Sequence, residues 1–169
     1  IWFGANDAAI PGLADHHHWP VEGYRTNLAQ LCRETPATQI LLVTPPPVHH
    51  AQRLAFQVRR YGDKATGQLE RTLEHTGQYA QACRQVAAEL GHPCLDLYTL
   101  MMQEDNDEKD YGRFFHDGLH FSPEGHDFVA ECLLEAIREV VADSGLVAHE
   151  QWVTKVVQLY ETQLVRRFS

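Results

Sequence analysis

Short apolar runs alternate along this chain with longer stretches in which apolar residues recur at helical spacing. Three of the runs have the length and the turn-rich flanks of buried strands. They are residues 1–3, which lead into the polar turn 4–7, residues 39–43, which end at three consecutive prolines, and residues 93–97. Proline cannot donate a ladder hydrogen bond, so the second strand must end there. We predict that the three runs are strands of one sheet.

Apolar positions three and four residues apart predict the helices. Gly91 stands where a left-handed C-cap would end one of them. Residues 49–62 have no clear pattern, and we expect a mobile helical or loop segment there. The predicted helices are 21–34, 67–91, a short helix ending near residue 103, 123–142 and 146–169.

Strands that alternate with helices indicate parallel βαβ units with helices covering the sheet. We therefore expect an α/β fold, a three-layer αβα sandwich with a mainly parallel sheet, over residues 1–144. Residues 145–169 are predicted to be a C-terminal amphipathic helical extension. The apolar face of residues 149–166 either packs on this domain or makes a homo-oligomer contact.

Composition and charge narrow the class of protein. A length of 169 residues suits one domain with a sizeable core. The formal net charge of −9 argues against a nucleic-acid binder, because phosphates need a basic surface. No apolar run reaches the roughly 18 residues of a membrane span.

The four cysteines lack metal-ligand spacing, and we expect free thiols in a reducing compartment, hence a cytoplasmic location. They are Cys32, Cys83, Cys94 and Cys132. The chain begins at Ile1 within a predicted strand, which indicates a fragment. The absence of a signal peptide is therefore no evidence about secretion.

The stretch from Asp117 to His120 is the main candidate for chemistry. It places a carboxylate and an imidazole three residues apart. Ser122 and Pro123 follow as an N-cap and a first helical residue, and that helix would hold the pair in place. An Asp that orients a His supplies two members of a nucleophilic triad. An incidental surface loop is the competing interpretation of this pair alone.

Asn6 is a second candidate, because it follows the first strand. Ligands of parallel α/β sheets bind beyond the carboxyl ends of the strands. An amide there can donate a hydrogen bond to an oxyanion, and Gly4 lets the chain turn tightly beside it. A plain turn is the favoured interpretation of this motif alone, but its combination with Asp117 and His120 is more specific.

Three further clusters resemble metal sites, but we expect solvated loops and no metal. Adjacent histidines point in different directions on an extended chain, and the acidic stretch lacks the Gly and Glu of a calcium loop. The clusters are Asp15 with His16, His17 and His18; His49 with His50; and Asp105, Asp107 and Asp110.

The motifs together resemble the SGNH, or GDSL, hydrolases. Gly4-Ala5-Asn6-Asp7 is similar to the third block of the family, and Asp117-Gly118-Leu119-His120 to its fifth. Within the family, the chain looks most like the isoamyl acetate-hydrolysing esterase branch. The resemblance covers most of residues 1 to about 141, including 1–8, 18–21, Tyr24, 27–28, 43–47, 79–80, 82–83, 95–98, 117–123 and Gly125.

This resemblance implies a flavodoxin-like SGNH fold and a serine esterase that acts on short-chain or acetate esters without a metal or organic cofactor. Asp117 would orient His120, which would take the proton of the serine hydroxyl. Asn6 would join two main-chain N–H groups in an oxyanion hole, supported by Gly4. A sugar-linked acetyl ester or an acyl thioester is a further substrate class that the sequence leaves open.

The nucleophile is where the chain departs from the family pattern. The family carries its Gly-Asp-Ser block on a first strand, and a second block with an oxyanion-hole Gly follows; both precede the start of this chain. Ser122, Ser144 and Ser169 are its only serines, and none stands in such a block. We therefore expect the first strand and the nucleophile to be missing, and the fragment alone to be inactive. The alternative is a catalytically inactive SGNH-fold protein that binds a partner through its C-terminal helix.

Overall fold

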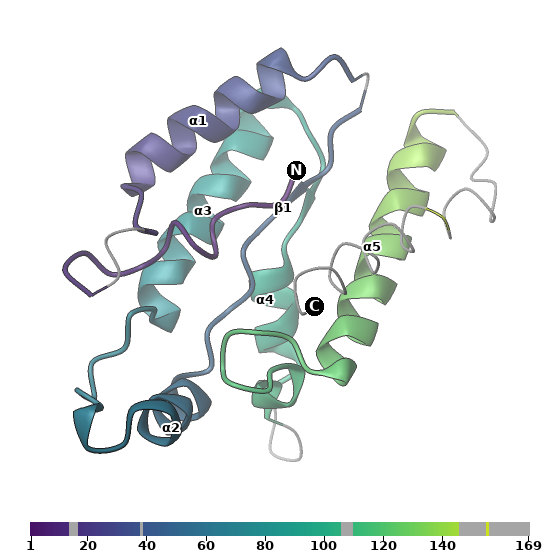
Figure 1. Ribbon diagram of the computed structural model, residues 1–169. Coiled ribbons are helices and arrows are strands. Elements are labelled where there is room, and N and C mark those ends of the chain that lie inside the picture. The colour runs from purple at the N-terminus through teal and green to yellow at the C-terminus, as the bar shows by residue number, and fades with distance from the viewer. Residues whose placement is uncertain (14–16, 38, 106–109, 146–154, 156–169) are drawn as a thin grey trace.

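The computed structural model describes residues 1–13, 17–37, 39–105, 110–145 and 155 (Figure 1). At its centre, β1 (Leu42–Val43) pairs in parallel with β2 (Cys94–Leu95). On the other side of β1, Trp2 forms a parallel bridge to Val43, whose N–H donates to the carbonyl of Ile1 at 3.0 Å. The three predicted strands are thus parallel neighbours, although each is shorter than predicted: Trp2 forms a single bridge, and Leu97, expected in the third strand, begins helix α4 (Leu97–Gln103).

The helices follow the predicted order with two differences. Residues 49–62, for which a mobile helical or loop segment was expected, form the regular helix His50–Tyr61 and a following 3-10 turn. The helix predicted from residue 67 begins at Leu73. Its N-cap is Thr72, which has an extended backbone and accepts the N–H of His75 at 3.2 Å. The elements are α1 (Val21–Glu34), α2 (His50–Tyr61), the 3-10 turn η1 (Gly62–Lys64), α3 (Leu73–Leu90), α4 (Leu97–Gln103), the 3-10 turn η2 (Tyr111–Phe114) and α5 (Pro123–Asp143).

Adjacent residues of β1 point into two separate apolar clusters. Leu42 packs with Leu28 of α1 and Tyr79 of α3, whereas Val43 packs with Phe114 of η2 and Val129 of α5. This alternation is what a strand covered on both faces requires. Figure 1 shows α1 and α3 on one side of the strands and α5 on the other. The α/β class and its three layers are confirmed.

Helix α5 begins as the sequence predicts. The Oγ of Ser122 accepts the N–H of Gly125 at 3.1 Å and donates to the carbonyl of Arg113 at 2.6 Å. Pro123 takes the first helical position, where a missing N–H costs nothing. The same serine therefore caps α5 and ties it to η2.

The predicted C-terminal helix and its oligomer contact lie outside the described residues, apart from Lys155, which is helical. The four cysteines are free thiols, as predicted. Among the described residues, no helix has both the length and the apolar character to cross a membrane.

Candidate active site

The loop that carries Asp117 is held between η2 and α5. An antiparallel bridge joins Phe115 to Phe121, and the main chain of His116 donates to that of His120 at 3.0 Å. At the tip, Gly118 has φ +81°, a conformation that L side chains rarely adopt. Its carbonyl accepts the N–H of His49 at 2.9 Å, at the start of α2. The loop is therefore short, and α2 supports it.

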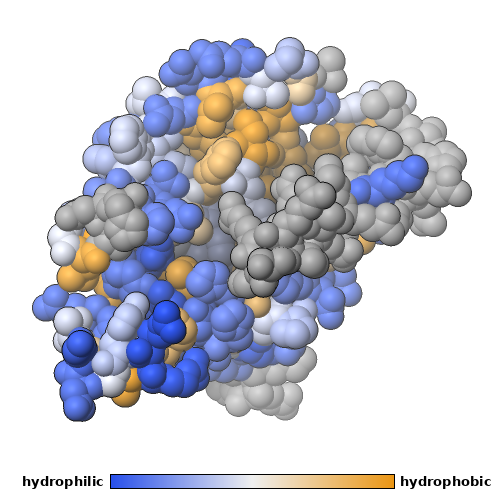
Figure 2. Space-filling view, viewed as in Figure 1, coloured by the Kyte–Doolittle hydropathy of each residue, from blue (hydrophilic) through white to orange (hydrophobic). Residues whose placement is uncertain are grey.

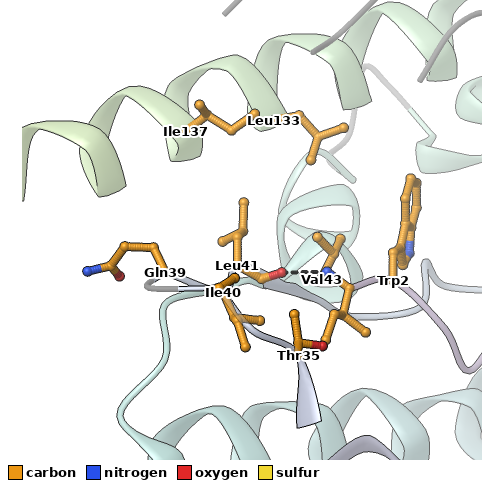
Figure 3. Close-up of a pocket in the computed structure, with 10 residues that line it drawn as sticks. Trp2, Thr35, Gln39, Ile40, Leu41, Val43, Leu133 and Ile137 are labelled. Carbon is orange, nitrogen blue, oxygen red and sulfur yellow. Dashed lines mark hydrogen bonds between the residues drawn. The ribbon is translucent and has the colours of Figure 1, made fainter. Parts of the chain in front are cut away.

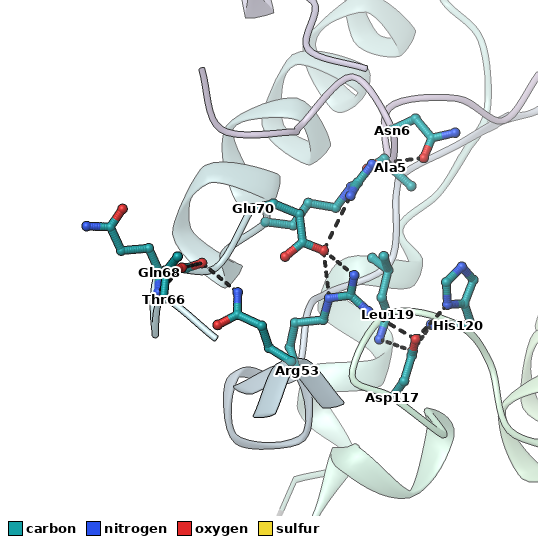
Figure 4. Close-up of polar contacts among 11 residues, drawn as sticks. Ala5, Asn6, Arg53, Thr66, Gln68, Glu70, Asp117, Leu119 and His120 are labelled. Carbon is teal, nitrogen blue, oxygen red and sulfur yellow. Dashed lines mark hydrogen bonds and ion pairs between the residues drawn. The ribbon is translucent and has the colours of Figure 1, made fainter. Parts of the chain in front are cut away.

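Within this loop the structure brings Asp117 and His120 together (Figure 4). The Oδ2 atom of Asp117 lies 2.8 Å from Nδ1 of His120. Its other oxygen accepts the main-chain N–H groups of Leu119 at 3.0 Å and of His120 at 2.8 Å. Asp117 is buried, whereas half of the His120 side chain is exposed. One carboxylate therefore fixes both the turn and the ring.

The charge of Asp117 follows from these contacts. Burial raises the pKa of its carboxyl, but hydrogen bonds from the ring and main chain of His120, and from the main chain of Leu119, outweigh burial and hold the pKa well below its usual range. An ionised carboxylate can only accept, so Nδ1 of His120 must carry a proton. In the neutral ring, Nε2 is then the nitrogen with the lone pair that a general base needs.

The second predicted group, Asn6, lies in the turn after the first strand. Gly4 has φ +112° there, and a Cβ on it would meet both Tyr24 and Pro45 at 3.2 Å. The Oδ1 of Asn6 accepts from Nη2 of Arg71 at 3.1 Å. Because a guanidinium only donates, the amide oxygen must face it and the NH₂ points elsewhere. The side chain of Asn6 is exposed, so this NH₂ is available to a ligand.

Three charged residues that no sequence motif marked join these groups. Nη1 of Arg53, on α2, donates to Oδ2 of Asp117 at 3.0 Å. The same guanidinium holds Oε1 of Glu70 through Nε, at 2.9 Å, and through Nη2. Arg71 approaches that oxygen at 3.7 Å. A contiguous polar network therefore links Asn6 to Asp117, and no sequence signal marked it because its members come from separate segments.

One described cluster has the composition of a metal site. The ligand atoms of His116, Asp117 and His120 lie within 4.8 Å of one another. However, both oxygens of Asp117 already accept hydrogen bonds, and the positive charge of Arg53 lies against one of them. This environment disfavours a cation.

The other histidine and acidic clusters have different outcomes. His49 was expected to be solvated, but this is wrong: it is largely buried, its Nδ1 caps α2 by accepting the N–H of Gln52, and its Nε2 lies 3.2 Å from Asp110. His18 hydrogen-bonds the carbonyl of Ala9 at 2.7 Å. Asp15, His16 and Asp107 lie outside the described residues.

Neither described serine is placed as a nucleophile. The Oγ of Ser122 is engaged on both sides by the cap of α5, and the Oγ of Ser144 donates to the carbonyl of Val140 at 2.7 Å. Ser169 lies outside the described residues. Both serine hydroxyls in the described part of the chain are therefore engaged in hydrogen bonds to the main chain.

An apolar cavity of about 400 Å³ lies between the strands and α5 (Figure 3). Leu133 and Ile137 of α5 face Leu41 and Trp2 across it. Figure 2 shows apolar side chains gathered on this part of the surface. The cavity is also lined by Thr35, Ala37, Gln39 and Ile40, which precede β1, whereas Asp117 and Asn6 belong to loops beyond the carboxyl ends of the strands. It is therefore separate from the candidate active site.

The fold and the contact between Asp117 and His120 define this chain as a parallel αβα domain that carries a carboxylate-bound histidine beyond the carboxyl ends of its strands. Residues 1–128 match the GDSL-like Lipase/Acylhydrolase family. The chain belongs to this family, as its motifs predict.

Similar proteins support this assignment. A GDSL esterase/lipase of Arabidopsis thaliana is 42% identical over 144 residues, which are 82% of this chain and 58% of that protein. The human isoamyl acetate-hydrolyzing esterase 1 homolog is 34% identical over 152 residues, 87% of this chain and 58% of its own length. The crystal structure of a lipase/acylhydrolase from Enterococcus faecalis superposes with a TM-score of 0.63 and 25% identity, over 82% of this chain and 60% of that one. The chain thus spans little more than half the length of the curated relatives it matches.

Proposed function

We propose that the protein is a serine-dependent carboxylic ester hydrolase that acts on short-chain or acetate esters. The Asp117–His120 pair carries this proposal: a buried carboxylate fixes the protonated Nδ1 of an exposed imidazole at 2.8 Å. The substrate class is supported by the human and bovine relatives, both isoamyl acetate-hydrolyzing esterase 1 homologs. A cytoplasmic location and a homo-oligomer contact through residues 149–166 stay predictions.

The chemistry follows from these groups. A serine hydroxyl bonds to the ester carbonyl carbon while its proton passes to Nε2 of His120. The carbonyl oxygen becomes an oxyanion, to which the NH₂ of Asn6 donates, and Asp117 stabilises the imidazolium. The tetrahedral intermediate then loses its alkoxy group, which takes the proton and leaves as an alcohol. Water attacks the acyl-serine in the same way and releases the acid.

The nucleophile itself is proposed to lie outside these 169 residues. The structural roles of Ser122 and Ser144 support this, as does the resemblance to a family whose Gly-Asp-Ser block precedes the region present here. The 169-residue chain alone is then expected to be inactive.

The test is to express the protein from its complete coding sequence and to assay a short-chain p-nitrophenyl ester. We expect turnover that falls by at least about 10²-fold in the His120→Ala variant, because the base is lost. Near wild-type turnover in that variant would show the triad assignment to be wrong. Absence of turnover in a folded complete protein would favour the inactive binding protein instead.

A further inference from the structure

We propose that Arg53, Glu70 and Arg71 are positioning residues, which together hold the general base and the oxyanion donor in one fixed arrangement. The catalytic meaning of this arrangement rests on the proposed function, whereas its electrostatic effect on His120 does not. Arg53 and Arg71 are each more than nine-tenths buried, although arginine is seldom buried without a partner. Their contacts show what they hold.

Arg53 acts on the Asp117 carboxylate. Its Nη1 donates to Oδ2 at 3.0 Å, and this is the same oxygen that accepts Nδ1 of His120 at 2.8 Å. A guanidinium at that position fixes the carboxylate and offsets part of its negative charge. The ring of His120 therefore faces a weaker negative field than Asp117 alone would provide.

Glu70 balances that cation. Its Oε1 accepts Nε and Nη2 of Arg53 and lies 3.7 Å from Nη1 of Arg71. One carboxylate thus lies between two buried guanidinium groups, which would otherwise repel each other. Removing Glu70 and removing Arg53 should change the potential at His120 in opposite directions.

Arg71 acts at the other end of the network, on the Asn6 turn. Its Nε donates to the carbonyl of Ala5 at 2.9 Å, and its Nη2 donates to Oδ1 of Asn6 at 3.1 Å. Burial lowers the pKa of Arg71, Glu70 raises it and Arg53 lowers it. The ordinary value is so high that the group stays charged. Arg71 thereby fixes the main chain and the amide orientation of the proposed oxyanion donor.

Figure 4 shows this network running from Asn6 through Glu70 and Arg53 to Asp117 and His120. Its parts come from the turn after the first strand, from α2, from the segment before α3 and from the loop before α5. Arg53 contacts Asp117 across 64 residues of sequence, and Arg71 contacts Asn6 across 65. The segment from α2 to Arg71 therefore contacts both the turn that carries Asn6 and the loop that carries Asp117, which are far apart in the sequence.

The electrostatic test uses the protein from its complete coding sequence, labelled at histidine, and follows the His120 ring by NMR from pH 4 to 9. We expect the midpoint of its titration to rise in Arg53→Gln and to fall in Glu70→Gln, by roughly 0.5 pH unit each. The neighbouring groups are Asp117 and the stacked ring of His116, which all variants retain. Arg25→Gln is the matched control, because Arg25 pairs with Glu89 between α1 and α3.

Opposite shifts support the proposal, because mere loosening of the structure would move both midpoints the same way. Shifts in one direction, or no larger than in Arg25→Gln, would overturn it. If Arg53→Gln does not fold, Arg53→Lys, which keeps the charge, replaces it and should titrate like the wild type. A shift in Arg53→Lys as large as the Glu70→Gln shift would then count against the proposal.

The positioning test uses kcat and a double-mutant cycle. If Arg71 acts only through Asn6, Arg71→Gln should lower kcat about 10-fold in the wild type and have no further effect in an Asn6→Ala background. Equal losses in both backgrounds would overturn the assignment of Arg71. If the wild type hydrolyses no ester, the proposed function fails, and the titrations alone decide whether Arg53 and Glu70 set the potential at His120.

Discussion

Asp117 contacts His120 through both of its carboxylate oxygens. Oδ2 lies 2.8 Å from Nδ1 of the ring, and Oδ1 accepts the main-chain N–H of the same residue at 2.8 Å. The carboxylate therefore fixes the backbone that carries the imidazole as well as its orientation and tautomer. A change at Asp117 should affect catalysis and folding together.

The first prediction concerns catalysis in Asp117→Asn. The amide cannot hold Nδ1 protonated in the same way, so His120 can present the wrong tautomer. We expect kcat for a short-chain p-nitrophenyl ester to fall by about 10³- to 10⁴-fold in the complete protein. The control is Asp127→Asn, an exposed carboxylate on α5, which should retain wild-type kcat. A loss of less than 10-fold in Asp117→Asn would contradict the role assigned to Asp117.

The second prediction is a pH dependence of stability. The folded-state pKa of Asp117 lies below its ordinary value of about 3.9. Its ionised form therefore stabilises the folded state at pH values above 3.9, and this contribution declines as the pH falls below that toward the folded-state pKa. The free energy of unfolding of the wild type should exceed that of Asp117→Asn by about 2–4 kcal/mol at pH 5.5.

Urea unfolding at pH 5.5 and pH 3 measures this difference. It should shrink at pH 3, while the corresponding difference for Asp127→Asn stays near zero at both pH values. A difference for Asp117→Asn that is the same at pH 3 and pH 5.5 would show that the carboxylate is not stabilised in the folded state.

The features that the sequence could predict depend on neighbours along the chain. The pattern around Leu42 predicts a strand covered on both faces, and Ser122-Pro123 predicts the start of α5. The Asp117–His120 contact is similarly local, because it spans three residues and Asp117 caps its own turn. Local patterns predict such features because the interacting groups are fixed by a few backbone dihedral angles.

The features that were missed depend on polar residues that turn inward. The buried residues of α2 are Arg53 and Gln57, so a search for apolar spacing finds no inward face there. The side-chain amide of Gln57 donates to the carbonyl of Gln68 and accepts the N–H of Gly67. Both partners lie in the segment that the sequence predicted to be the start of helix α3. These partners are distant in sequence or lie in irregular backbone, and neither hydrophobic spacing nor cap signals specify such contacts.

The third prediction concerns the close approach of the Asp117 loop to α2. A Cβ on Gly118 would lie 2.5 Å from both the main-chain N of Arg53 and the carbonyl O of His49. Gly12 has the same φ of +81°, but a Cβ there would meet nothing within 4 Å. Gly12→Ala should therefore cost only the backbone strain, about 1–2 kcal/mol. Gly118→Ala should cost at least 1 kcal/mol more, because the loop must move away from α2.

Urea unfolding of the two variants at pH 7 measures this difference directly. We also expect Gly118→Ala to lower kcat in the complete protein, since Arg53 and Asp117 separate, whereas Gly12→Ala should not. Equal losses of stability in the two variants would show that the contact between Gly118 and α2 is not tight.

The fourth prediction separates a structural serine from a catalytic one. Ser122 lies two residues after the proposed base, His120. Its Oγ caps α5 and donates to the carbonyl of Arg113. Ser122→Ala should lower the free energy of unfolding by about 1–2 kcal/mol, in the range of lost N-caps. Because the hydroxyl takes no part in the proposed reaction, kcat in the folded complete protein should stay within about threefold of the wild type.

Ser144→Ala is the control for this measurement, since that hydroxyl bonds a carbonyl at the opposite end of the same helix. It should have little effect on stability and none on kcat. A 10³-fold loss of kcat in Ser122→Ala, with folding retained, would instead identify Ser122 as the nucleophile. Such a result would place the complete triad within these 169 residues and would overturn the inference that the nucleophile lies outside them.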